Sequence, residues 1–87
     1  MARVILARRA RLQREGLDWP VIDAIEEALG LLEREPYAGH PLRGRLTGLR
    51  SLRVGSFRVI YAISEDSSVV RVAAIRHRAS AYGTDPR

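Results

Sequence analysis

The segment that decides the fold is LRSLRVGSFRVIYAI, residues 49–63. It holds two runs rich in Val, Ile, Leu and aromatic residues, Leu49–Val54 and Phe57–Ile63, a composition typical of β-strands. Gly55-Ser56 separates the runs, and Gly at the first position of a two-residue loop indicates a type II′ turn. The segment therefore predicts a tight β-hairpin whose register is fixed by its turn.

That register would place Val54 opposite Phe57 and Arg53 opposite Arg58. Opposed residues on one face of a hairpin have Cβ atoms about 5 Å apart, and like charges there are destabilising. Residues 49–63 contain no Asp or Glu that would neutralise the two arginines. A phosphate between the guanidinium groups would relieve the repulsion, and so would splaying of both side chains into solvent. We favour a phosphate site at this pair.

The chain before the hairpin is mainly helical. Arg3–Leu6 predicts a short strand, and residues 7–15 predict a helix that ends at Gly16. A second helix follows Asp18, an N-cap candidate, and ends before Pro36. Its apolar residues, spaced by three and four positions, form one core-facing stripe: Ile22, Ile25, Leu29 and Leu32. The short connection between the helices indicates an antiparallel helical hairpin.

The remaining segments complete the predicted fold. Pro36–Gly48 contains three Gly and two Pro, which predicts a connecting loop or an irregular crossing. Val69–Ile75 predicts a third strand of the meander after the polar turn Glu65–Ser68, and residues 76–87 form a polar tail. The predicted class is α+β, with an N-terminal strand and a two-helix hairpin packed on a mostly antiparallel β-sheet.

Composition narrows the possible functions. The 87 residues carry 15 Arg, no Lys and 10 Asp or Glu, so the formal net charge of +5 points to an anionic partner. The length indicates one domain, residues 1–87. The absence of Cys excludes a disulfide scaffold, a thiol nucleophile and a Cys-ligated zinc site. Since neither a secretory signal nor a membrane-length apolar run occurs, we expect a cytoplasmic protein without membrane contact.

A second cluster of polar residues follows the last predicted strand. Arg76-His77-Arg78 comes directly after Ile75, and one helical turn would bring Tyr82 to the same side as Arg78. His and Tyr can transfer protons while Arg stabilises negative charge. The cluster could instead be a solvated strand end with an anchoring tyrosine.

Two isolated side chains are better explained by structure than by chemistry. We interpret His40, which lies in the Gly- and Pro-rich stretch before Pro41, as structural. We expect Trp19 to pack against the start of the second helix as a hydrophobic staple.

The order of these motifs resembles the RelE side of the RelE/ParE toxin superfamily. The resemblance is carried by GHPLRGRL at residues 39–46, LRVGSFRVIY at residues 52–61, RHR at residues 76–78, and Tyr82. It runs over nearly the whole chain, and residues 52–61 are its most specific part. These toxins are small, basic α+β proteins of bacterial type II toxin–antitoxin modules.

The resemblance implies a metal-independent endoribonuclease that cleaves messenger RNA on the ribosome through attack of the RNA 2′-hydroxyl, without a cofactor. It places Arg58 on the scissile phosphate and Arg53 where the family often has Lys. The catalytic residues that the resemblance and the chemistry suggest together are Arg53, Arg58, His77, Arg78 and Tyr82. The expected RNA-binding residues are Arg43, Arg45, Arg50 and Arg76. The implied partners are a cognate antitoxin protein in a heteromeric complex, messenger RNA and the ribosome.

Two other functions stay open. ParE-like members of the superfamily share the fold but inhibit DNA gyrase, and they generally lack the Arg and Tyr constellation. A binding module that holds an acidic partner without catalysis is the other alternative. The sequence leaves undecided which residue is the general base, because Arg at position 53 stays protonated where a Lys could be tuned.

Overall fold

The computed structural model describes residues 1–77. The elements follow one another as β1 (Arg3–Leu6), α1 (Arg8–Glu15), α2 (Trp19–Arg34), β2 (His40–Pro41), the 3₁₀ turn η1 (Gly44–Leu46), β3 (Arg50–Val54), β4 (Phe57–Ile63) and β5 (Val69–His77). None of the helices in this range is long and apolar enough to cross a membrane.

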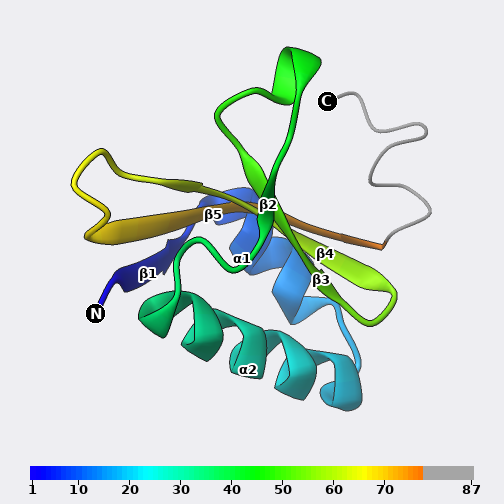
Figure 1. The fold of residues 1–87 in the computed structure, drawn as a ribbon. Helices are drawn as coiled ribbons and strands as arrows, with labels where there is room; N and C mark the ends of the chain where they lie inside the picture. Colours follow the sequence, from blue (N-terminus) through cyan, green and yellow to red (C-terminus); the bar gives the residue numbers. More distant parts are fainter. Residues whose placement is uncertain (78–87) are drawn as a thin grey trace.

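The strands form one mixed sheet in the order β1-β5-β4-β3-β2 (Figure 1). Neighbouring strands are antiparallel except β1 and β5, which are parallel. The α1 and α2 helices are joined by residues 16–18, and the chain turns back between them. The predicted α+β class, with a helical hairpin on a mostly antiparallel sheet, is confirmed.

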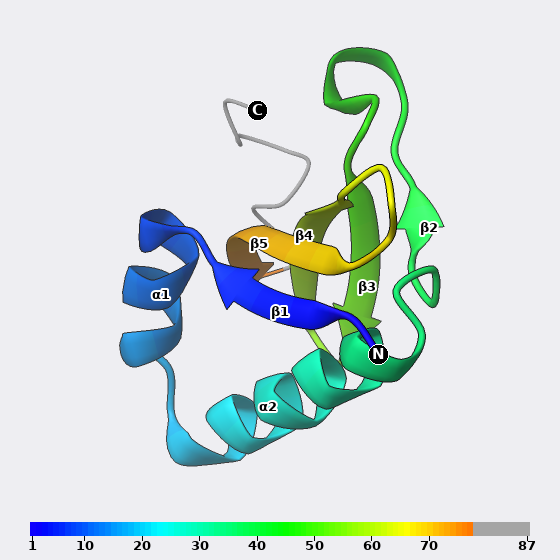
Figure 2. The ribbon, with the colours of Figure 1, turned by 90° about the vertical axis from the view of Figure 1, so that its left-hand side faces the viewer.

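The core lies between the helices and one face of the sheet (Figure 2). The helices contribute Ile25 and Leu32 from the predicted stripe of α2 and Ala10 from α1, all with no exposed surface. The sheet contributes buried residues at alternate positions of β4 and β5: Val59, Tyr61, Val70 and Val72. This alternation leaves the other face of the strands available for polar side chains.

The predicted hairpin register is confirmed. Val54 pairs with Phe57 and Arg53 pairs with Arg58 across β3 and β4. Gly55 has a φ of +60°, as the first central position of a type II′ turn requires, and glycine adopts this conformation without steric strain.

The stretch Pro36–Gly48, predicted as a connecting loop or an irregular crossing, contains the short strand β2. His40–Pro41 pairs with Ser51 and Arg50 of β3, and His40 is exposed on this edge. Gly39 before it has no room for a side chain, because a Cβ atom would lie 2.5 Å from the Ser51 carbonyl oxygen. The buried Tyr61 hydroxyl accepts a hydrogen bond from the Gly39 N–H at 3.0 Å. Close packing of this segment against β3 and β4 therefore creates β2, which composition alone did not indicate.

Two further expectations were wrong in detail. The β5 strand continues through Arg76 and His77, which we had assigned to the polar tail. Trp19 does not staple α2, since it is 73% exposed at the first position of the helix. Leu17 and Val21, on either side of the N-cap Asp18, pack against the core there instead.

Candidate nucleic-acid interface

Three arginines from three strands lie side by side across the sheet. Arg53 of β3 is directly opposite Arg58 of β4, and Arg58 is directly opposite Arg76 of β5. Directly opposed residues share one face of a sheet, with Cβ atoms about 5 Å apart. We call Arg53, Arg58 and Arg76 the arginine row.

The row lies on the face that the helices leave uncovered. Val59 and Ile75, the chain neighbours of Arg58 and Arg76, are buried in the helix-side core. Since side chains alternate along a strand, the arginines point to the opposite face. β3, β4 and β5 contain no Asp or Glu, so their own sequences supply no carboxylate to neutralise the row.

The arginines of the row differ in exposure and in their contacts. Arg53 is exposed, and its Nε donates to the Gly55 carbonyl oxygen of the turn at 3.3 Å. Arg58 and Arg76 are half-buried, and each has interactions within the protein. Guanidinium groups bind phosphate through paired N–H donors and remain protonated. A row of one exposed and two half-buried arginines can hold an RNA backbone in a fixed position.

His77 points away from the row. It is directly opposite Phe57 in the β4–β5 ladder, and the two rings meet edge to face with centroids 5.2 Å apart and an interplanar angle of 80°. His77 therefore shares the face of Phe57, whereas the neighbouring Arg76 shares the face of Arg58. The structure separates His77 from the arginines with which the sequence grouped it.

Arg50 also lies apart from the row. It is opposite the buried Tyr61 on the helix-side face, and its Nη2 donates to the Gly39 carbonyl oxygen at 2.6 Å and to the Tyr37 carbonyl oxygen at 3.2 Å. Its guanidinium carbon lies 5.0 Å from the centre of the Tyr37 ring. These contacts hold the segment before β2 on the sheet.

The other two arginines of the expected RNA-binding set lie in the loop between β2 and β3. Arg45 is part of η1 and Arg43 precedes it, and both are exposed. This loop projects from the end of β3 opposite the Gly55-Ser56 turn (Figure 1). Arg78 and Tyr82, the remaining candidates, lie outside the described residues.

Sequence reasoning missed two further arginines. Arg71 of β5 is opposite Ala62 of β4 on the face of the row, and Arg3 of β1 extends that face toward the sheet edge. The local alternation Val70-Arg71-Val72, with both valines buried, could have revealed Arg71. Within residues 1–77, no group of three His, Asp or Glu side chains is placed to hold a metal ion.

Comparisons with known proteins agree on the class of protein to which this chain belongs. The sequence model described as the ParE toxin of the type II toxin–antitoxin system parDE matches residues 4–82. Toxin RelG of Mycobacterium tuberculosis is 41% identical over 59 residues, which are 67% of this chain and 68% of that protein. Toxin RelE of the same organism is 38% identical over 63 residues, 71% of this chain and 65% of that toxin.

Solved structures show the same fold. The toxin–antitoxin complex RelBE2 of Mycobacterium tuberculosis contains a chain that aligns with a TM-score of 0.81 and 34% identity, over 88% of this chain and 98% of that one. A RelE–RelB complex from Pyrococcus horikoshii aligns with a TM-score of 0.77 and 25% identity, over 92% and 98% of the two chains. The protein is thus a toxin of a type II toxin–antitoxin system. It belongs to the ParE toxin family within the RelE/ParE superfamily, and the predicted RelE-like identity is confirmed.

Proposed function

We propose that the protein is an endoribonuclease that cleaves messenger RNA on the ribosome, with the RNA backbone held on the arginine row. The observation that carries the proposal is the alignment of Arg53, Arg58 and Arg76 on one face of three strands that contain no carboxylate. Three guanidinium groups on one face give this part of the sheet a positive charge that attracts the phosphates of RNA. The curated relatives at 41% and 38% identity are RelE-type toxins, which supports the same activity.

The chemistry follows from the charge of the row. The 2′-oxygen of the RNA attacks the adjacent phosphorus, the bond to the 5′-oxygen breaks, and a 2′,3′-cyclic phosphate and a 5′-hydroxyl result. The 2′-hydroxyl gives up one proton and the leaving 5′-oxygen takes one up. Arg58, at the centre of the row, donates to the phosphorane oxygens, and Arg53 and Arg76 flank it. This step needs no covalent nucleophile from the protein.

The proton transfers are assigned to groups beyond the row. Arginine stays protonated, so the row supplies charge and hydrogen bonds rather than a base. His77 packs against Phe57 on the other face, which leaves Tyr82 and the RNA or ribosome as the proposed proton carriers. We also propose that a cognate antitoxin holds the toxin in a heteromeric complex, as in the RelBE2 and RelE–RelB complexes.

The test compares wild type with Arg58→Ala by growth after induction and by mapping of new RNA 5′ ends. We expect cleavage to fall by about 100-fold to 1,000-fold, the usual effect of removing one transition-state donor. Arg34→Ala removes the same charge from the exposed end of α2 and should cut like wild type. A folded Arg58→Ala protein that still cleaves RNA at codon-phased positions would contradict the proposal.

Inhibition of DNA gyrase is the second candidate, because the matching family model is the ParE toxin. A supercoiling assay with purified gyrase separates the two activities. Growth arrest with inhibited supercoiling and intact messenger RNA would establish inhibition of DNA gyrase as the activity. Absence of arrest would favour a binding module.

A further inference from the structure

His40 lies on the same face of the sheet as the arginine row. It is directly opposite Ser51 in the β2–β3 ladder, and Ser51 shares a face with Arg53 because side chains alternate along β3. His40 is therefore a diagonal neighbour of Arg53, and residues in this relation lie about 7–8 Å apart. The His40 side chain is exposed, and within residues 1–77 it forms no hydrogen bond, ion pair or ring contact. No contact in this range supports the structural role that the sequence suggested for His40.

Ser51, opposite His40, has a buried hydroxyl that lacks a partner. The residue has no exposed surface, and within the described chain its Oγ forms no hydrogen bond. A buried hydroxyl without a partner is unfavourable. An imidazole ring turned over β3 would supply the partner, since one ring N–H of His40 could donate to the Ser51 Oγ. That bond would leave the second ring nitrogen as a proton acceptor on the face of the row.

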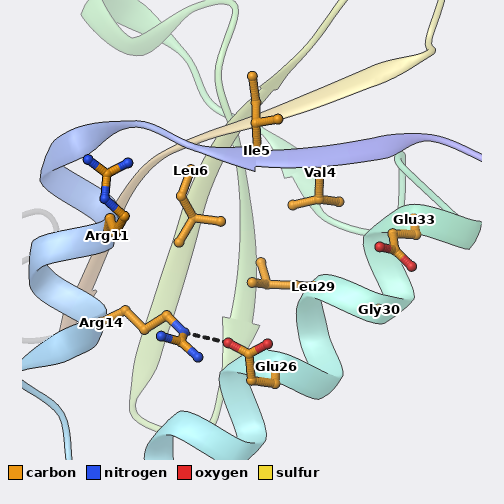
Figure 3. Close-up of a pocket in the computed structure, with 9 residues that line it drawn as sticks. All are labelled: Val4, Ile5, Leu6, Arg11, Arg14, Glu26, Leu29, Gly30 and Glu33. Carbon is orange, nitrogen blue, oxygen red and sulfur yellow. Dashed lines mark hydrogen bonds and ion pairs between the residues drawn. The ribbon is translucent and has the colours of Figure 1, made fainter.

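The carboxylates of residues 1–77 lie away from the row. They belong to the two helices and their ends, or to the turn between β4 and β5, which lies at the other end of β4 from the row. Figure 3 shows two of them, Glu26 and Glu33, on α2 in the helical layer, where Glu26 is paired with an arginine of α1. His77 packs against Phe57 on the helix-side face. Since histidine changes charge near neutral pH, His40 is the described side chain on the face of the row that is suited to accept a proton.

We propose that His40 is the general base that takes the proton from the RNA 2′-hydroxyl, and that the Ser51 hydroxyl positions its ring. The inference rests on the proposed endoribonuclease activity. Neutral imidazole accepts the 2′-proton and becomes imidazolium, while the 2′-oxygen bonds to phosphorus and the bond to the 5′-oxygen breaks. The proton that the leaving 5′-oxygen needs comes from the other proposed carriers, Tyr82 and the RNA or ribosome. The imidazolium adds positive charge beside the phosphorane.

The surroundings of His40 suit a nucleotide. Side chains as long as those of His40 and Arg53 can reach toward each other from diagonal positions, with a phosphate and its adjacent ribose between them. β2 pairs with β3, whose charged side chains are Arg53 on the same face and Arg50 on the other. The loop that follows β2 adds Arg43 and Arg45, both exposed. Neither β3 nor this loop contains a carboxylate, so these neighbours attract RNA to the base.

The test measures single-turnover cleavage of a short messenger RNA on purified bacterial ribosomes by the full chain. We expect His40→Gln to lower the rate by about 100-fold or more, the usual contribution of a general base. The wild-type rate should fall toward acid pH with a single protonation, and His40→Gln should lose this dependence. Glu35→Gln, which removes an exposed titratable group at the end of α2, should cleave like wild type. Binding of an RNA with a 2′-deoxy nucleotide at the cleavage position should be unchanged in both variants.

Ser51→Ala tests the positioning role. We expect the rate to fall by about 3-fold to 10-fold, the effect of one hydrogen bond. The acid limb of the pH profile should move to lower pH, because the hydroxyl accepts more strongly from imidazolium than from the neutral ring. A lower rate with an unmoved acid limb would reduce Ser51 to a packing residue and overturn this part of the inference.

Chemical rescue separates a base from a residue that only binds RNA. Free imidazole should restore part of the cleavage lost in His40→Ala and none of that lost in Arg58→Ala. Wild-type cleavage by His40→Gln beside an inactive Arg58→Ala would overturn the inference and leave the endoribonuclease intact. A loss in His40→Ala that imidazole does not restore, together with weaker RNA binding, would also overturn it. Absence of cleavage by the wild type would instead contradict the proposed endoribonuclease, and the inference with it.

Discussion

Arg50 and Arg53 show how position along one strand divides identical side chains between two roles. Both belong to β3, but Arg50 is opposite Tyr61 on the core side and Arg53 is opposite Arg58 on the uncovered side. Arg50 donates to the carbonyl oxygens of Tyr37 and Gly39, so its charge serves the packing of the segment before β2. We therefore leave Arg50 out of the proposed RNA interface.

The Asp66 carboxylate makes stability depend on pH. Hydrogen bonds from the Ser68 side chain, the Ser64 side chain and the Ser68 N–H lower the pKa of Asp66 from 3.8 to about 2. Because the pKa is lower in the folded state, the stabilisation is present above pH 3.8 and is lost as the pH falls from 3.8 toward 2. Urea unfolding across this range should show a weaker pH dependence for Asp66→Asn than for wild type.

Asp23→Asn on the exposed surface of α2 is the matched control for that experiment. It removes one carboxylate without touching the turn between β4 and β5. Identical pH dependence of the free energy of unfolding in wild type and Asp66→Asn would contradict the assignment to Asp66.

At the scale of elements, α1 supports the end of β5 that carries Arg76. β1 pairs with β5 only as far as Val72, so the following edge of β5 has no strand beside it. α1 packs there, and the Gln13 Oε1 accepts a hydrogen bond from the Ile75 N–H at 2.7 Å. The register of β5 against β4 shifts at Ile60 and Tyr61, just before this point. Gln13 therefore fixes the part of β5 that brings Arg76 into the row.

Gln13→Leu should remove this support while keeping the size of the side chain. An unsatisfied, partly buried N–H costs about 1–3 kcal/mol, so we expect a loss of that order in the free energy of unfolding and faster exchange of the Ile75 amide. RNA cleavage should also fall, because Arg76 would no longer be held in the arginine row. Gln13→Glu keeps an oxygen acceptor and should largely restore the exchange rate, and a Gln13→Leu protein with unchanged Ile75 exchange would show that the contact is dispensable.

At the scale of the whole molecule, the strands carry positive charge alone, whereas the helices carry both signs. The uncovered face of the sheet carries Arg3, Arg53, Arg58, Arg71 and Arg76. The strands contain no acidic residue. In the helical layer α2 is acidic and α1, with the sequence RRARLQRE, is basic. This distribution favours binding of a polyanion to the sheet, since no carboxylate of the strands lies among its arginines.

Salt dependence measures how many phosphates the sheet contacts. With three contacts, the slope of log affinity against log salt for an uncleavable single-stranded RNA should be about −2, at roughly −0.7 per contact. Arg53→Ala should reduce the slope to about −1.4, while Arg34→Ala should leave it unchanged. A slope equal to wild type in Arg53→Ala would remove Arg53 from the interface. Titration by fluorescence anisotropy at several salt concentrations gives these slopes.

The sequence by itself determined the hairpin and therefore the first two members of the row. A two-residue turn with Gly at its first position fixes register locally, so the pairing of Arg53 with Arg58 needed no knowledge of the rest of the chain. The spacing of apolar residues in α2 and the β-type composition of the strands β3, β4 and β5 were also local signals. The family resemblance followed from these same motifs.

Only the tertiary structure decided which side chains of β5 join the arginine row and which edge of β1 stays unpaired. The position of Arg76 beside Arg58 and the turn of His77 toward Phe57 depend on how far β5 continues along β4, which α1 and a register shift control. The open edge of β1 exists because β1 pairs with β5 on one side alone. These features arise from contacts between residues far apart in the chain, and no spacing within a single segment encodes them.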